Sequence, residues 1–155
     1  MIILERLQLV STGIREQGTG IREQGEENKK ERKEKMKTTI SDYRDLKVWQ
    51  KSMSLCEEVY ALIKMFPAEE RYALCDQLRR AVVSIPSNIA EGNGRDSRTE
   101  YARFLAIARG SVFEVQTQLE LAERFGYIKV PSSTQESLVE ISKILYTLIR
   151  KLRTT

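Results

Sequence analysis

The sequence predicts an all-α protein: an up-down-up-down four-helix bundle with a disordered N-terminal extension. Four segments of about 20 residues each carry apolar residues at alternating spacings of three and four, as amphipathic helices do. The 155 residues include only 8 glycines and 3 prolines, too few for the many turns of an all-β fold. Short links between the four segments favour antiparallel neighbours.

The first 40 residues are expected to form the disordered extension, and residues 41–155 the bundle. TGIREQG occurs twice without a change in residues 12–25, and the charged run EENKKERKEK follows it. Such a run has nothing to bury and is typical of a solvated coil. Because Lys, Glu, Arg and Met have purine-rich codons, KKERKEK ahead of Met36 is typical of a translated ribosome-binding region. Met36 is therefore a candidate native start; the alternative is a real disordered tail that serves as an arm for RNA.

The first helix is predicted from an apolar seam between Leu46 and Ile63 with spacings of 3, 4, 3, 4 and 3. Asp42 or Asp45 is suited to cap its start. Pro67 ends it, because the residue before a proline is pushed out of the α region. The seam residues are Leu46, Trp49, Met53, Cys56, Tyr60 and Ile63.

The second helix begins near Glu69 and contains Pro86, because its apolar stripe continues on both sides of the proline. A proline inside a helix frees the carbonyl four residues earlier, here that of Val82, and usually kinks the helix. Polar side chains beside it are expected to bond the freed groups or to reach a partner helix. These are Ser84, Ser87 and Asn88, and the stripe itself is Leu74, Leu78, Ala81, Ile85 and Ile89. Gly92 or Gly94 ends the helix; EGNGR has no preceding strand and no Walker lysine, which excludes a phosphate loop.

The third helix is expected to start with Ser97 as N-cap and Glu100 in a capping box, and to stop at Gly126. Gly110, four residues after Ala106, predicts a close helix contact, for which the surface from Ser84 to Asn88 is the candidate partner. The stripe of this helix is Tyr101, Phe104, Leu105, Ala108, Val112, Val115, Leu119 and Ala122. A second capping box, Ser133 and Glu136, opens the fourth helix, whose stripe is Leu138, Ile141, Leu145, Leu148 and Leu152.

The composition argues against an enzyme. Histidine is absent, which excludes a histidine base, a Ser-His-Asp triad and a histidine-ligated metal. Cys56 and Cys75 form no C-x-x-C motif and are expected to be buried, reduced thiols of a cytoplasmic protein. No catalytic residue, cofactor or metal site is expected. No apolar run reaches the roughly 18 residues of a membrane span, so a membrane is not an expected partner.

Arginines are the remaining candidate functional residues. Between Arg71 and Arg109 there are seven arginines and four acidic residues, an excess of +3. Arginine holds phosphate oxygens in a bidentate fork, so six of them are candidate contacts to RNA or DNA: Arg79, Arg80, Arg95, Arg98, Arg103 and Arg109. The alternative is ion pairing alone, because Asp76 precedes Arg80, and Glu91 precedes Arg95, by one helical turn.

Further apolar residues lie beside the four seams and widen them, which favours a homo-oligomer. They are Val48, Val59, Val82, Val83, Ile107, Ile144 and Ile149.

Two stretches resemble a known family. RRAVVSIPSNIAEG (residues 79–92) and FLAIARGS (residues 104–111) are similar to the bacterial four-helix bundle proteins named for 23S rRNA intervening sequences, which in turn resemble accessory proteins of diversity-generating retroelements. The similarity runs from about Asp45 to Ile128. The positions that match the family's motif are Ser84, Pro86, Asn88, Glu91, Gly92 and Gly110.

The resemblance implies a homopentamer of four-helix bundles and, from the retroelement members, association with a reverse transcriptase and nucleic acid. It also supports Arg79, Arg80 and Arg109 as part of a basic surface. Two hypotheses follow. The first is a non-enzymatic oligomer that binds RNA or DNA through its arginines, as accessory to a nucleic-acid enzyme; the second is a protein-binding scaffold without nucleic-acid contact.

Overall fold

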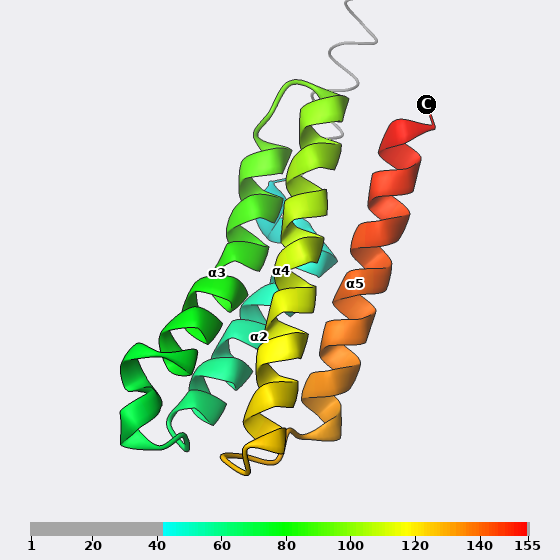
Figure 1. The fold of residues 1–155 in the computed structure, drawn as a ribbon. Coiled ribbons are helices and arrows are strands. Elements are labelled where there is room, and N and C mark those ends of the chain that lie inside the picture. Colours follow the sequence, from blue (N-terminus) through cyan, green and yellow to red (C-terminus); the bar gives the residue numbers. More distant parts are fainter. Residues whose placement is uncertain (1–41, 155) are drawn as a thin grey trace, which may run out of the picture. The chain divides into compact units, whose positions relative to one another are not determined.

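The computed structural model describes residues 42–154, which form four α-helices with short links and no strand (Figure 1). The helices are α2 (Lys47–Ile63), α3 (Leu74–Asn93), α4 (Arg98–Arg124) and α5 (Ser132–Arg153). Two short 3₁₀ helices are η1 (Tyr43–Asp45), before α2, and η2 (Ala68–Tyr72), between α2 and α3. The predicted all-α four-helix fold is confirmed. The predictions for residues 1–40 and for Met36 lie outside the described residues.

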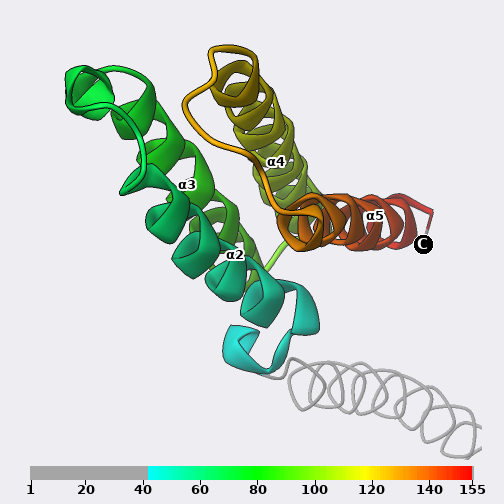
Figure 2. The same ribbon diagram turned by 90° about the horizontal axis from the view of Figure 1, so that it is seen from below.

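Consecutive helices run in opposite directions, and each packs against two neighbours (Figures 1 and 2). The contact between α3 and α4 is the most extensive, and that between α2 and α5 closes the ring. Within residues 42–154, the diagonal pairs α2–α4 and α3–α5 have no Cα atoms within 8 Å of each other. One consequence matters for the site: the start of α4 lies beside the end of α5.

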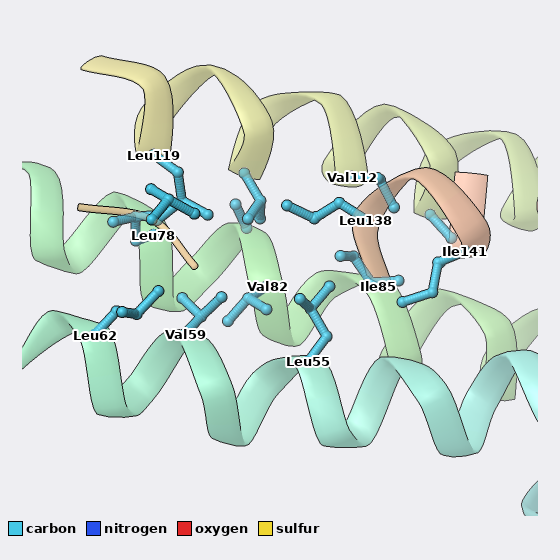
Figure 3. Close-up of a cluster of buried hydrophobic side chains, with 14 of the residues drawn as sticks. Leu55, Val59, Leu62, Leu78, Val82, Ile85, Val112, Leu119, Leu138 and Ile141 are labelled. Atoms are coloured by element: carbon cyan, nitrogen blue, oxygen red, sulfur yellow. The ribbon is translucent and has the colours of Figure 1, made fainter. Parts of the chain in front are cut away.

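All four helices contribute fully buried side chains to one core (Figure 3). The predicted stripes of α3 and α4 are confirmed, with Leu74, Tyr101 and Phe104 only half-buried. In α5 the core continues from Leu145 to Ile149. The predicted Leu148 and Leu152 are half-buried at its edge.

Apart from Ile63, which is buried as predicted, the predicted seam of α2 is wrong by one residue. The residues of α2 that face the core are Val48, Ser52, Leu55, Val59 and Leu62, together with Ile63. Of the predicted seam, Met53 and Tyr60 are 39% and 42% exposed, and Cys56 is half-buried. Since neighbouring residues on a helix point about 100° apart, α2 carries two parallel apolar stripes, and only one of them faces the core.

Several helix ends follow the predicted chemistry. The Ser97 side chain accepts a hydrogen bond from the Glu100 backbone N–H at 3.4 Å, as a capping residue does. Gly126 ends α4 with a φ of 75°, and the next N–H, of Tyr127, donates to the Ala122 carbonyl at 2.9 Å. That pattern is a Schellman motif, in which glycine takes the left-handed position.

Other ends differ from the prediction. The helix α5 starts at Ser132 after Pro131 and has no side-chain cap, so the predicted capping box of Ser133 is wrong. Asp42 caps η1 instead of α2, by accepting from the Arg44 N–H at 3.1 Å. At the start of α3, Glu70 from η2 accepts the Leu74 N–H at 3.2 Å.

Pro86 lies inside α3, as predicted, and the carbonyl that it frees has a partner on another helix. The Cys56 thiol of α2 donates to the Val82 carbonyl, with Sγ 3.3 Å from the oxygen. Nearby, Ser87 Oγ donates to the Val83 carbonyl at 2.8 Å, and Asn88 donates to the Ser84 carbonyl at the same distance. Side chains thus satisfy the backbone around the proline.

Glycine permits the close approach of α3 and α4 at Gly92. A Cβ there would lie 2.7 Å from the Cβ of Phe104 and 2.9 Å from a ring carbon of Tyr101, closer than atoms pack. The close contact predicted at Gly110 is wrong, because Gly110 is exposed and an added Cβ would meet no atom within 4 Å. The helices instead meet one residue later, where Ser111 Oγ lies 2.9 Å from Ser84 Oγ.

Candidate nucleic-acid interface

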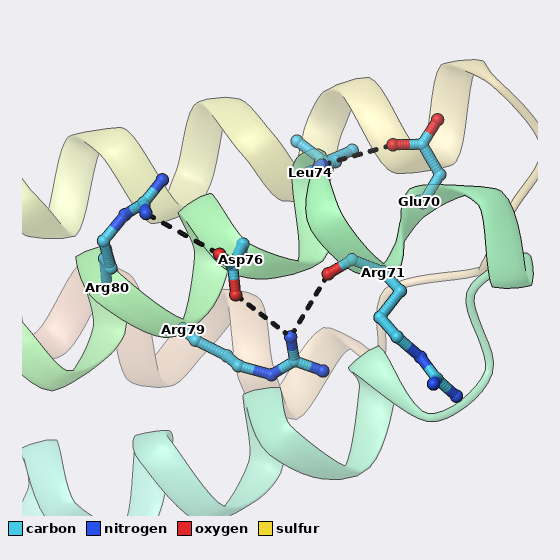
Figure 4. A network of polar contacts seen from close by, with 6 residues as sticks. All are labelled: Glu70, Arg71, Leu74, Asp76, Arg79 and Arg80. Atoms are coloured by element: carbon cyan, nitrogen blue, oxygen red, sulfur yellow. Dashed lines mark hydrogen bonds and ion pairs between the residues drawn. The ribbon is translucent and has the colours of Figure 1, made fainter.

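The six candidate arginines fall into two groups, and the first group lies on α3 or just beyond it. Arg79 and Arg80 both pair with Asp76, at 3.4 and 3.7 Å, and Arg79 also donates to the Arg71 carbonyl (Figure 4). Arg95 pairs with Glu91 one turn earlier. These arginines carry local ion pairs, as the alternative interpretation of the sequence predicts, although the pairs are exposed and contribute little to stability.

The second group, Arg98, Arg103 and Arg109, lies along the first half of α4. Arg98 donates to the Lys151 carbonyl of α5 at 3.3 Å. Arg103 makes a long contact, 3.8 Å, to Glu100. Helix α4 therefore presents a row of arginines beside the C-terminal half of α5.

Arg109 is stacked between two aromatic rings. Its guanidinium lies 5.0 Å from the ring centroids of both Phe113 in α4 and Tyr146 in α5, and its Nε donates to Ser142 Oγ at 3.4 Å. Arg150 lies 5.9 Å from the Tyr146 ring. We call Phe113, Arg109, Tyr146 and Arg150 the aromatic ladder. Such cation–π contacts fix the direction of a guanidinium and leave edge N–H groups available.

Where the start of α4 lies beside the end of α5, three arginines surround a hollow of about 530 Å³. Arg98 and Arg103 come from α4, and Arg153 comes from α5. Its other lining residues are Thr99, Ala102, Ala106 and Leu152, so no acidic side chain lines it. We call it the arginine hollow. Its charge suits an anionic group such as a phosphate.

Sequence reasoning missed the contribution of α5 to this surface. Residues 141–155 contain four basic residues and no acidic one, and residues 98–113 contain three arginines and one glutamate. The two stretches lie on neighbouring, antiparallel helices, and five of their arginines lie where these helices meet: Arg98, Arg103, Arg109, Arg150 and Arg153. The sequence feature that could have revealed this contribution is the C-terminal stretch, which contains basic but no acidic residues. We call this the α4–α5 surface.

A different surface lies between α2 and α3. The second apolar stripe of α2 forms one wall of an open groove, and α3 forms the other with Val83 and Pro86. The α2 side consists of Trp49, Met53, Cys56, Glu57 and Tyr60, next to Tyr43. The groove is lined almost entirely by apolar atoms, unlike the α4–α5 surface.

The reactive groups of the described residues are few. Both cysteines are free thiols, and burial, with a smaller effect of Glu57, raises the pKa of Cys56 to about 11. A thiol with that pKa is almost entirely protonated near neutral pH and is a poor nucleophile. Residues 42–154 hold no group of three or more Cys, Asp or Glu side chains placed to bind a metal. None of the described helices is long and apolar enough to cross a membrane.

Comparison with known proteins places this fold in a family. The chain is 30% identical to a protein of unknown function from the S23 ribosomal protein family of Bacteroides thetaiotaomicron, whose crystal structure it matches with a TM-score of 0.61. The match covers 66% of this chain and 97% of that one. No curated protein matches the chain. The family model described as 23S rRNA-intervening sequence protein matches residues 44–147, which is most of the chain, and the protein therefore belongs to that family.

Proposed function

We propose that this protein is a non-enzymatic homo-oligomer that binds RNA or DNA through the α4–α5 surface. The observation that carries the proposal is the gathering of five arginines from two neighbouring helices on one surface. Arginines that outnumber the carboxylates around them release counterions when they contact phosphates, which favours binding. The contacts assigned to α4 are Arg98, Arg103 and Arg109, with Arg150 and Arg153 from α5.

The α2–α3 groove supports the oligomeric part of the proposal. Met53, Tyr60 and Val83 are about two-fifths exposed, at 39%, 42% and 42%. Exposed apolar stripes of this kind mark protein interfaces. A second copy of the chain would cover the stripe, and the family resemblance gives the pentamer as the expected assembly. The resemblance also supplies a reverse transcriptase as a candidate partner, with the protein as its accessory.

The test is a titration of a labelled structured RNA, and of a DNA of equal length, by fluorescence anisotropy over a range of salt concentrations. We expect the logarithm of affinity to fall linearly with the logarithm of salt concentration. Replacing Arg98, Arg103 and Arg109 together by alanine should weaken the slope by about 2 to 3. The matched control is the pair Arg79→Ala and Arg80→Ala, since those arginines share Asp76 and should affect the slope less.

A protein-binding scaffold is the second candidate function, and the ion pairs of Arg79, Arg80 and Arg95 favour it. For a scaffold, the slope of log affinity for nucleic acid against log salt concentration should be near zero. None of the arginine substitutions should change it. That result would reject the nucleic-acid proposal and leave the oligomer as the unit of function.

A further inference from the structure

We infer that the α4–α5 surface recognises unpaired nucleotides, by stacking a base on Phe113 while the arginine hollow holds the backbone phosphates. The inference rests on the proposed function and names its substrate class: single-stranded nucleic acid, or the single-stranded loops of a folded RNA. It comes from two observations on one surface, the exposed aromatic ladder and the arginine hollow.

Two large aromatic side chains lie exposed among the basic residues. Phe113 is 45% exposed and Tyr146 is 47% exposed. Proteins that bind duplexes through the backbone contact phosphates with cations and polar groups. Proteins that bind single strands combine a positive surface with aromatic rings, because an unpaired base offers a flat face that stacks on such a ring.

The Phe113 ring is held by Arg109 and is still partly accessible. Arg109 lies over both rings, and Arg150 is also near Tyr146. Within the described residues, Phe113 has Arg109 as its only cation or ring contact. The Arg109 guanidinium lies over one face of Phe113 and holds the ring in place, and the exposed part of the ring is where we place the base.

The arginine hollow lies at a suitable distance along the same helix. Arg103 and Arg98 precede Phe113 by 10 and 15 residues, or about 15 and 22 Å at 1.5 Å per residue. A short run of nucleotides bridges that distance, within the roughly 4–16 nucleotides that single-strand-binding domains occupy. Arg109 lies between the two ends and is placed to contact an intervening phosphate.

The experiment uses the full chain and four labelled probes of equal length: an oligouridylate, an oligothymidylate, an abasic DNA strand and a blunt-ended RNA duplex. Binding is measured by anisotropy at one salt concentration. We expect the two strands with bases to bind at least tenfold more tightly than the abasic strand or the duplex. Comparing the affinities of the oligouridylate and the oligothymidylate shows whether the protein prefers RNA to DNA. Tight binding of either strand supports the inference.

The decisive variant is Phe113→Leu, which keeps an apolar side chain at an exposed site and should fold normally. Loss of one base stack should weaken binding of the strands with bases about 5- to 150-fold, with no change for the duplex. Phe113→Tyr keeps an aromatic ring and should bind these strands as tightly as the unchanged protein does. Phe125→Leu is the matched control, since Phe125 is 58% exposed at the C-terminal end of α4, away from the arginine hollow.

The outcomes separate the two proposals. If no probe binds, the proposed function fails. If the duplex binds as tightly as the strands, or if Phe113→Leu binds every probe as the unchanged protein does, the inference of base stacking is wrong while nucleic-acid binding through the arginines stands.

Discussion

Replacing Cys56 by alanine removes the hydrogen-bond donor that reaches the carbonyl freed by Pro86. In an ordinary helix the Val82 carbonyl would accept from the N–H of residue 86, but proline has none. The Cys56 thiol on α2 takes this place, 3.3 Å from the oxygen. Cys56 on α2 and Pro86 on α3 are therefore coupled through the carbonyl of Val82, a residue whose side chain is fully buried.

The size of the effect follows from the two losses. An unsatisfied buried carbonyl costs about 1 to 3 kcal/mol, and the low end applies because a thiol is a weak donor. Removing the half-buried sulfur adds about 0.5 to 1 kcal/mol of lost burial. We therefore expect Cys56→Ala to lower the free energy of unfolding by about 1.5 to 2 kcal/mol. In a Pro86→Ala background the new N–H restores the helical bond, and the cost of Cys56→Ala should fall by about 1 kcal/mol.

The assay is urea unfolding followed by circular dichroism for the four proteins of the double-mutant cycle. All four are measured at one protomer concentration, because assembly contributes to apparent stability. Cys56→Ser serves as the control, since its hydroxyl keeps a donor. If the two alanine substitutions are additive within about 0.3 kcal/mol, the thiol does not compensate for the proline, and the reasoning is refuted.

Three further predictions concern other parts of the protein. Gly92→Ala should destabilise the protein by about 1 to 3 kcal/mol, because the new methyl group would clash with α4. Gly110→Ala should stabilise it by about 0.5 to 1 kcal/mol. Urea unfolding measures both variants, and equal effects would contradict the close contact of Gly92 with α4. The hydrogen bond to Glu70 raises the pKa of Tyr127 above its ordinary value of 10.0. This stabilisation is complete below the unfolded pKa and is lost as pH rises through the folded one, so unfolding above pH 10 should show a steeper loss in the unchanged protein than in Tyr127→Phe. Met53→Glu places a charge in the α2–α3 groove and should shift the molecular mass from light scattering towards the monomer; an unchanged mass would remove the groove from the interface.

Most of the fold could be predicted from the sequence, because helical periodicity is a local property. The seam of α2 could not. The stripes that start at Val48 and at Trp49 both have helical spacing, and the sequence does not say which one meets its own core. The buried Ser52 made the correct stripe look less apolar, and it is satisfied by donating to the Val48 carbonyl at 2.6 Å.

The site was predicted in part, for a different physical reason. The ion pairs of Arg80 and Arg95 lie one turn apart on one helix, so the sequence contains them. The ladder brings together Arg109 and Tyr146, which are far apart in the chain and meet only because α4 and α5 pack antiparallel. Counting charges along the sequence does not reveal this contact between Arg109 and Tyr146.

The ring of helices also bears on how the chain folds. Three of its four helix contacts join consecutive helices, so most of the packing is local in sequence. The fourth contact, between α2 and α5, is the smallest, and it includes the exposed pair of Lys51 and Glu140, which are 89 residues apart. Low contact order favours rapid folding. We expect the α3–α4 hairpin to form the nucleus, and the first and last helices to come together after the rate-limiting barrier.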